Sequence, residues 1–127
     1  MSMIEDGKVV DSWAISSGAS GTPTHTGNYT INWKTPLQNM RGYERRGGER
    51  FKDPNWSGPT DSQGYAMFEQ PNVRWAMYFN GNQAFHGVYW HSNWGNRMSH
   101  GCVGMPEWRA QQLYEWTPQG VEVSIHY

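Results

Sequence analysis

The sequence is poor in features that would place it in several common protein classes. Its 127 residues include a single cysteine, Cys102, so an internal disulfide is excluded. No apolar run reaches the roughly 18 residues of a transmembrane helix, and no signal-peptide core follows the start, so we expect any export signal or anchor to have been removed or never present. Ten basic and eleven acidic residues give a net charge of −1, which argues against nucleic acid or a membrane surface as partner.

Aromatic residues and turn formers are instead abundant. Aromatics make up 15% of the chain, with eight tryptophans, and fifteen glycines and seven prolines are present. This composition favours a mainly β fold with long functional loops over a helical bundle. The length suits one domain, residues 1–127, with a core of its own.

Alternation and turn residues predict where the strands lie. The expected strands are 8–15, 28–33, 73–80, 83–90 and 121–127, with a two-residue turn at 81–82. The helix is expected to begin at Pro106, continue through "EWRAQQLYEW" and end before Pro118 and Gly120. Between them, residues 36–59 lose periodicity but keep aromatics, so we expect a long excursion that packs on the domain as a flap over a site.

The lone thiol has histidines close to it in sequence. A reactive cysteine needs a group that lowers its pKa or accepts its proton, and histidine does both. His86 ends a predicted strand and can face Cys102 across a β pair, so it is the favoured general base. His100, two residues before Cys102, is a candidate substrate contact or structural donor. Gly101 can turn its backbone so that N–H groups bind an oxyanion.

Two simpler interpretations compete with a nucleophile. A single cysteine is more often a small buried hydrophobe than a catalyst. His86, His91, His100 and Cys102 could together supply four zinc ligands, although their spacing matches no structural zinc pattern. The residue types alone leave these interpretations open.

The stretch "AFHGVYWHSNWGNRMSHGCVGM" resembles the active-site signature of the L,D-transpeptidase catalytic domain, the YkuD-like family. His86-Gly87 matches the first part of that signature, and 99–103, "SHGCV", match the second. The stretch "GTPTHTGNYTI" (21–31) looks like the family's segment near the domain start, and "LYEWTPQGVEVSIHY" is similar to its closing helix and strand. The resemblance therefore covers nearly the whole chain.

The resemblance implies a fold and a chemistry. The fold would be a β-sandwich or partly open barrel, with one short helix after the cysteine segment. Cys102 would attack the third-residue carbonyl of a peptidoglycan tetrapeptide stem, release D-Ala and pass the acyl group from a thioester to an amine, forming a 3→3 cross-link. His86 would be the general base and acid, and the Gly87 carbonyl would orient its ring. Backbone N–H groups of His100, Gly101 and Cys102 would bind the oxyanion, without metal or cofactor.

Further residues are candidates for substrate binding: Ser99, Tyr89, Trp90, His91, Trp94 and Gly104. Gly104 departs from the family, which usually has Asn or Arg there, so the expected substrate contact is in doubt. The family also usually has a strand before "DGKVV", and we expect that strand to be missing, as if the domain were trimmed at its N-terminus.

The resemblance also bears on partners and location. It implies peptidoglycan stem peptides as substrates, carbapenem-type β-lactams as covalent inhibitors, and a place in the periplasm, in the cell wall or outside the cell. The alternatives are an L,D-carboxypeptidase, in which water is the acceptor, a cysteine peptidase or amidase with other substrates, and a non-catalytic wall-binding module. A catalytic thiol would be alkylated fast near neutral pH with a lowered pKa, which the binding module does not require.

Overall fold

A four-stranded sheet organises the chain around the cysteine segment. The computed structural model describes residues 1–19, 21, 23–46, 49–99 and 101–126. Within them, the sheet has the order β11-β9-β8-β5, and its strands are β5 (Trp33–Tyr43), β8 (Met67–Asn80), β9 (Gln83–Val88) and β11 (Val103–Pro106). β11 runs parallel to β9, and the other two pairs are antiparallel. The predicted hairpin across 81–82 is confirmed, although β8 is longer than expected.

The helix in the described residues is α1 (Glu107–Trp116), which begins directly after β11. Pro106 is its N-cap residue, and its C-terminus closes where the N–H of Thr117 donates to the carbonyl of Leu113 (3.0 Å). Ala110 and Leu113 are buried among Met77, Phe85, Met105 and other core residues. The sequence prediction of this helix is therefore confirmed. No described helix is long and apolar enough to cross a membrane.

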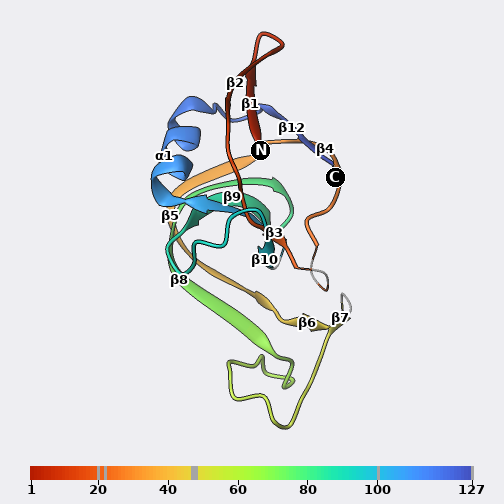
Figure 1. Cartoon of the computed structure of the whole chain (residues 1–127). Helices are drawn as coiled ribbons and strands as arrows, with labels where there is room; N and C mark the ends of the chain where they lie inside the picture. Colours follow the sequence, from red (N-terminus) through yellow and green to blue (C-terminus); the bar gives the residue numbers. More distant parts are fainter. Residues whose placement is uncertain (20, 22, 47–48, 100, 127) are drawn as a thin grey trace.

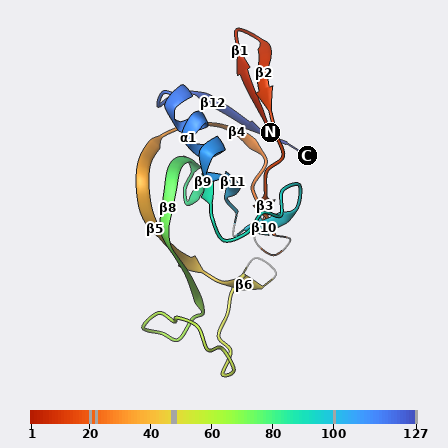
Figure 2. The same ribbon diagram turned by 60° about the vertical axis from the view of Figure 1, so that its left-hand side comes forward.

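Shorter strand pairs surround the central sheet (Figures 1 and 2). They are β1 (Ser2–Glu5) with β2 (Lys8–Ser12), β3 (Ser17–Gly18) with β10 (Arg97–Ser99), β4 (Gly27–Thr30) with β12 (Glu122–Ile125), and β6 (Arg45–Arg46) with β7 (Glu49–Arg50). The expectation that a strand before "DGKVV" is missing was wrong, because β1 lies there. Asp6 and Gly7 both have positive φ (51° and 76°), as a tight turn from β1 into β2 requires.

The expected aperiodic excursion proves to contain a strand in its first part. β5 continues through Pro36 to Tyr43 and pairs with β8 along this length, with a register shift between Gln38 and Met40. Proline is tolerated there because β5 is an edge strand, where a missing N–H costs no ladder bond. The ribbon of β5 and β8 carries the loop at 51–66 away from the body (Figure 1). We call residues 40–46 and 49–70 the flap.

Candidate functional site

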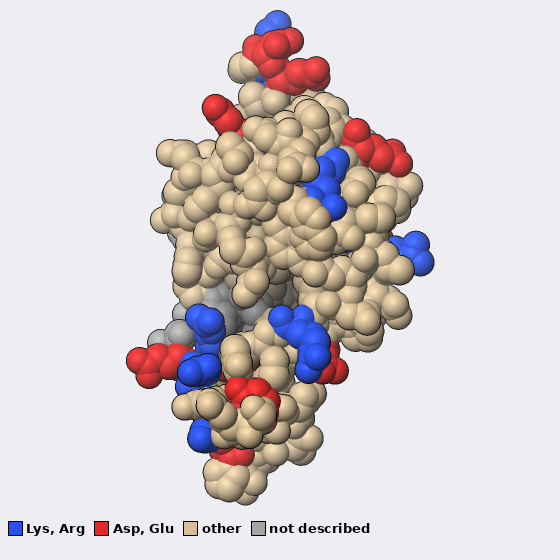
Figure 3. Space-filling view, turned by 180° about the vertical axis from the view of Figure 1, so that it is seen from behind, with Lys and Arg blue, Asp and Glu red and all other residues tan. Residues whose placement is uncertain are grey.

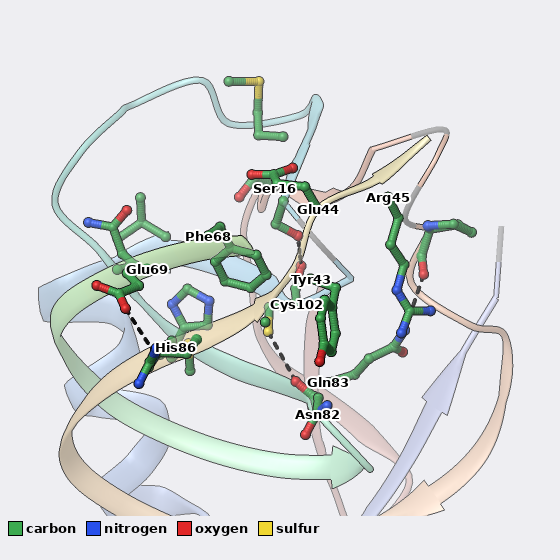
Figure 4. A pocket seen from close by; sticks show the side chains of 18 of the residues that line it. Ser16, Tyr43, Glu44, Arg45, Phe68, Glu69, Asn82, Gln83, His86 and Cys102 are labelled. Carbon is green, nitrogen blue, oxygen red and sulfur yellow. Dashed lines mark hydrogen bonds and ion pairs between the residues drawn. The ribbon is translucent and has the colours of Figure 1, made fainter. Parts of the chain in front are cut away.

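Strand register places the cysteine segment beside the histidine. Gly104 pairs with His86 across the parallel β9–β11 contact, so Cys102, just before β11, lies next to the start of β9. The thiol of Cys102 donates to the carbonyl of Asn82 (3.6 Å). Cys102 and His86 both line one cleft of about 630 Å³. Figure 4 shows them pointing into the same space, with Tyr43 and Phe68 of the flap beside them.

His86 is fixed in a single tautomer. It is 3% exposed, and its Nδ1 lies 2.8 Å from the carbonyl oxygen of Gly87. A carbonyl only accepts, so Nδ1 carries the hydrogen and Nε2 keeps a free lone pair. Burial lowers the pKa of His86 below its usual value, against an opposing effect of the Gly87 bond. The indole of Trp90 stacks on the ring (5.8 Å, 25°). At neutral pH His86 is thus an uncharged proton acceptor.

Cys102 is not a resting thiolate. Burial raises the pKa of its thiol to about 11, although a hydrogen bond with the backbone of Ala84 opposes this. The lowered pKa expected for a catalytic thiol is contradicted. The Cys102 thiol and the His86 ring are both neutral, so the reactivity of the thiol depends on a base that takes its proton during attack. Among the described residues no three His, Cys, Asp or Glu side chains group as metal ligands would. His100, one of the zinc candidates, lies outside the described residues.

Slow alkylation follows from the raised pKa. We expect iodoacetamide to modify Cys102 of the folded protein at pH 7 at least about tenfold more slowly than free cysteine, whose pKa is about 8.5. The rate should climb steadily as the pH approaches 11. The alkylation rate is measured at each pH by quenching samples at set times and recording the intact mass, with urea-unfolded protein as the control. A plateau below pH 8 would show a thiolate that the structure does not support.

The turn before Cys102 is held by two side chains, Ser99 at the end of β10 and Thr24 in the loop before β4. The hydroxyl of Ser99 donates to the carbonyl of Cys102 (2.5 Å) and accepts from the N–H of Gly101 (3.3 Å). The hydroxyl of Thr24 donates to the carbonyl of Gly101 (2.8 Å). Gly101 has φ of 115°, and a Cβ there would lie 2.8 Å from Nε2 of Gln83. Glycine is therefore favoured at 101 by the positive φ, whereas the nearby Nε2 ends a flexible side chain that can move aside.

The expected substrate-binding residues separate into two groups. Trp90, His91 and Ser99 line the cleft. Tyr89 does not: its hydroxyl accepts from Nε2 of Gln70 and donates to the carbonyl of Pro71. Trp94 packs against the ring of His91 (5.3 Å) without lining the cleft.

Gly104 occupies a packed position instead of a place in the cleft lining. Its N–H donates to the carbonyl of Ser16 (2.9 Å), and its carbonyl accepts from the N–H of Ser16 (2.8 Å). A Cβ at 104 would lie 2.5 Å from Oγ of Ser16 and 2.6 Å from Cγ2 of Val88. Ser16 and Val88 thus occupy the space that a larger side chain at position 104 would need.

Placing at 104 the asparagine that is usual in the family it resembles should therefore destabilise this chain. We expect Gly104→Asn to lower the free energy of unfolding by about 1–3 kcal/mol, the usual cost of overpacking, and Ser16→Ala in the same chain to recover part of it. Gly81→Asn is the matched control, because Gly81 has φ of 54° and open space, a conformation that asparagine tolerates. Urea denaturation measures all three; an unchanged Gly104→Asn would contradict the packing.

Several cleft residues that were not among the expected site residues come from distant segments. Tyr78 on β8 donates to Oε1 of Gln38, and its pKa is raised by burial and by the nearby Cys102. Arg45 and the ion pair of Arg41 with Glu69 (2.9 Å) come from the flap. Figure 3 shows the molecule hollowed between body and flap, with basic side chains at the margins. The flap expected at 36–59 covers Arg41 and Arg45, but Glu69 and Tyr78 lie outside it on β8.

Comparison with known proteins gives one family. The family model for the YkuD L,D-transpeptidase catalytic domain matches residues 1–125. The comparison with curated proteins finds no match.

Solved structures share the fold. An Enterococcus faecium L,D-transpeptidase carrying a cysteine-to-serine mutation is 21% identical, with 96% of this chain and 43% of that chain covered and a TM-score of 0.72. A Mycobacterium smegmatis L,D-transpeptidase is 19% identical, with 96% and 51% covered and a TM-score of 0.71. The L,D-transpeptidase LdtMt1 in complex with imipenem is 17% identical, with 94% and 50% covered and a TM-score of 0.68. This chain therefore spans about half the length of these proteins or less.

Proposed function

The chain belongs to the L,D-transpeptidase catalytic-domain family, and we propose that it is a peptidoglycan acyltransferase with Cys102 as nucleophile. The observation that carries the proposal is the pairing within one cleft of a protonated thiol and a histidine whose Nε2 is free to accept. The Gly87 carbonyl holds that tautomer, as a general base requires.

In the first half-reaction, the thiol leaves the Asn82 carbonyl and turns toward His86. Sγ attacks the third-residue carbonyl of a tetrapeptide stem as its proton passes to Nε2 of His86. The carbonyl oxygen becomes an oxyanion, for which the proposed donors are the backbone N–H of Cys102, that of Gly101 once it leaves the Ser99 hydroxyl, and that of His100, which lies outside the described residues. The carbon–nitrogen bond then breaks, His86 returns the proton to the leaving amine, and D-Ala departs from a thioester on Cys102.

In the second half-reaction, a side-chain amine of another stem attacks the thioester. Its proton passes to His86, the carbon–sulfur bond breaks, and Sγ takes the proton back, which leaves a 3→3 cross-link and the free enzyme. Water in place of the amine gives a tripeptide, the carboxypeptidase outcome. No external reductant, oxidant or cofactor enters this balance.

The same nucleophile suits β-lactam acylation. The imipenem complex of a structural neighbour supports carbapenem-type β-lactams as covalent inhibitors of this chain. The proposed substrate is cell-wall polymer, so we propose that the chain acts in the periplasm, in the wall or outside the cell.

Product analysis tests the function. Purified disaccharide-tetrapeptides are incubated with the protein, with Cys102→Ala as the matched control, and the products are identified by mass spectrometry. Cross-linked dimers absent from the control establish the transpeptidase, and tripeptide monomers alone establish the carboxypeptidase. Unchanged substrate that still binds overturns the acyltransferase and favours a wall-binding module.

A further inference from the structure

A second histidine in the cleft is held in the tautomer opposite to that of His86. The backbone N–H of Asn93 donates to Nδ1 of His91 (3.0 Å). Nδ1 is therefore the acceptor, and the hydrogen of the neutral ring lies on Nε2. Burial lowers the pKa of His91, which keeps the ring uncharged. His91 lines the cleft, and the nitrogen it can offer to a ligand is an N–H donor.

Aromatic neighbours fix the position of this donor. The ring of His91 lies edge-on to Trp90 (6.4 Å, 81°) and tilted on Trp94 (5.3 Å, 44°). Trp90 in turn stacks on His86, so the four rings form a continuous row from the base outward. His91 is close enough to His86 for a positive charge on one to disfavour a charge on the other.

The geometry points to His91 as a neutral hydrogen-bond donor to the carboxylate of the leaving D-residue. This inference rests on the proposed function and names a further substrate contact of that site. His86 must face the leaving amine to protonate it, so the leaving residue lies on the His86 side of the scissile bond. The Nε2–H of His91, on the same side of the cleft, would therefore meet the leaving D-residue. The one strong hydrogen-bond acceptor of that D-residue is its terminal carboxylate.

The tautomers can be measured without substrate. Long-range ¹H–¹⁵N spectra of the histidine side chains should show the Nδ1–H form for His86 and the Nε2–H form for His91 at pH 7. Finding Nδ1–H at His91 would overturn the inference whatever the activity.

Two substitutions separate the two nitrogens of His91. Asparagine places an acceptor where Nδ1 was and can still bond the N–H of Asn93, as residues two apart do in Asx-turns, but offers nothing at the Nε2 position. Glutamine reaches the Nε2 position with an amide donor. We expect His91→Asn to lower kcat/KM about 10- to 100-fold, in line with loss of a bond to a charged acceptor, and His91→Gln to retain most of it. Equal losses would overturn the inference.

A substrate lacking the carboxylate identifies the acceptor. With ethylamine in place of the last residue, wild type and His91→Asn should react at the same rate. A persistent difference would place the contact elsewhere and overturn the inference. The acid limb of the pH profile should persist in both variants, because His86 is the base, and should move slightly to higher pH, because His91 no longer lowers the pKa of His86. Disappearance of the limb would make His91 a proton-transfer group instead.

Binding measurements on the inactive Cys102→Ala variant distinguish failure of the His91 inference from failure of the proposed function. In Cys102→Ala, tryptophan fluorescence gives the Kd of the tetrapeptide and of its decarboxylated analogue. A preference for the carboxylate that His91→Asn removes supports the contact even if the wild type transfers no acyl group. No preference overturns it even if the wild type is active.

Discussion

Replacing His86 by glutamine is expected to lower kcat/KM for acyl transfer by about 10³- to 10⁴-fold, the upper part of the range for a general base. Cys102 begins as a protonated thiol with its pKa raised to about 11, so attack without a base draws on a very small thiolate population. Steady-state assay of tripeptide or dimer formation measures the loss. Because burial lowers the pKa of His86, the wild-type rate should fall with acidification only below pH 6.5, and this limb should vanish in the variant.

Two comparisons keep this result interpretable. His126→Gln makes the same substitution outside the cleft lining and should leave the rate unchanged. His86 is almost fully buried, so thermal melting of the variant establishes that it folds. Iodoacetamide needs no base, so alkylation of Cys102 should be little affected in folded His86→Gln. A folded variant with undiminished acyl transfer would remove His86 from the mechanism.

Gly101→Ala should be the next most damaging change, with acylation about 10²- to 10³-fold slower, as when an oxyanion donor is lost. Its φ of 115° is unsuited to alanine, and the new Cβ would also displace the flexible amide end of Gln83, 2.8 Å away. The turn would have to shift, and the N–H groups around Cys102 would shift with it. Acylation by imipenem, followed by intact mass against time, isolates this half-reaction.

Gly64→Ala distinguishes backbone strain from damage to the site. Gly64 also has positive φ, 87°, but nothing lies within 4 Å of its Cβ position. Both variants should lose about 1–3 kcal/mol of stability from the backbone, and only Gly101→Ala should acylate slowly. Similar acylation by the two would mean that the turn at 101 does not position the reacting groups.

Local patterns were sufficient to predict α1, the β8–β9 hairpin and the closing strand. Each rests on neighbouring residues: Pro106 before good helix formers, a two-residue turn at 81–82, and alternating apolar residues in β12. The strand through Pro36 was missed, since proline opposes a strand unless that strand lies at an edge. Edge position is a property of the assembled sheet.

In the candidate site, too, local sequence patterns predicted some features, whereas others depend on the assembled fold. The motif around Cys102 singled out His86, Gly87 and Gly101, and the β9–β11 register brings His86 and Cys102 into one cleft. The raised pKa of Cys102 could not be predicted, because burial depends on segments far away in sequence. Tyr78 and the flap residues enter the cleft only through tertiary structure.

The protonated state of Cys102 has a consequence for the durability of the protein. Peroxide converts a thiolate, and hardly a thiol, to sulfenic acid, from which further oxidation to sulfinic and sulfonic acids is irreversible. With a pKa of about 11, the sulfur is largely shielded from this damage while the cleft is empty. It becomes a strong nucleophile only during the proton transfer that accompanies attack. A lone cysteine with no second thiol in the chain to form an intramolecular disulfide can thus remain reduced where peroxide is present.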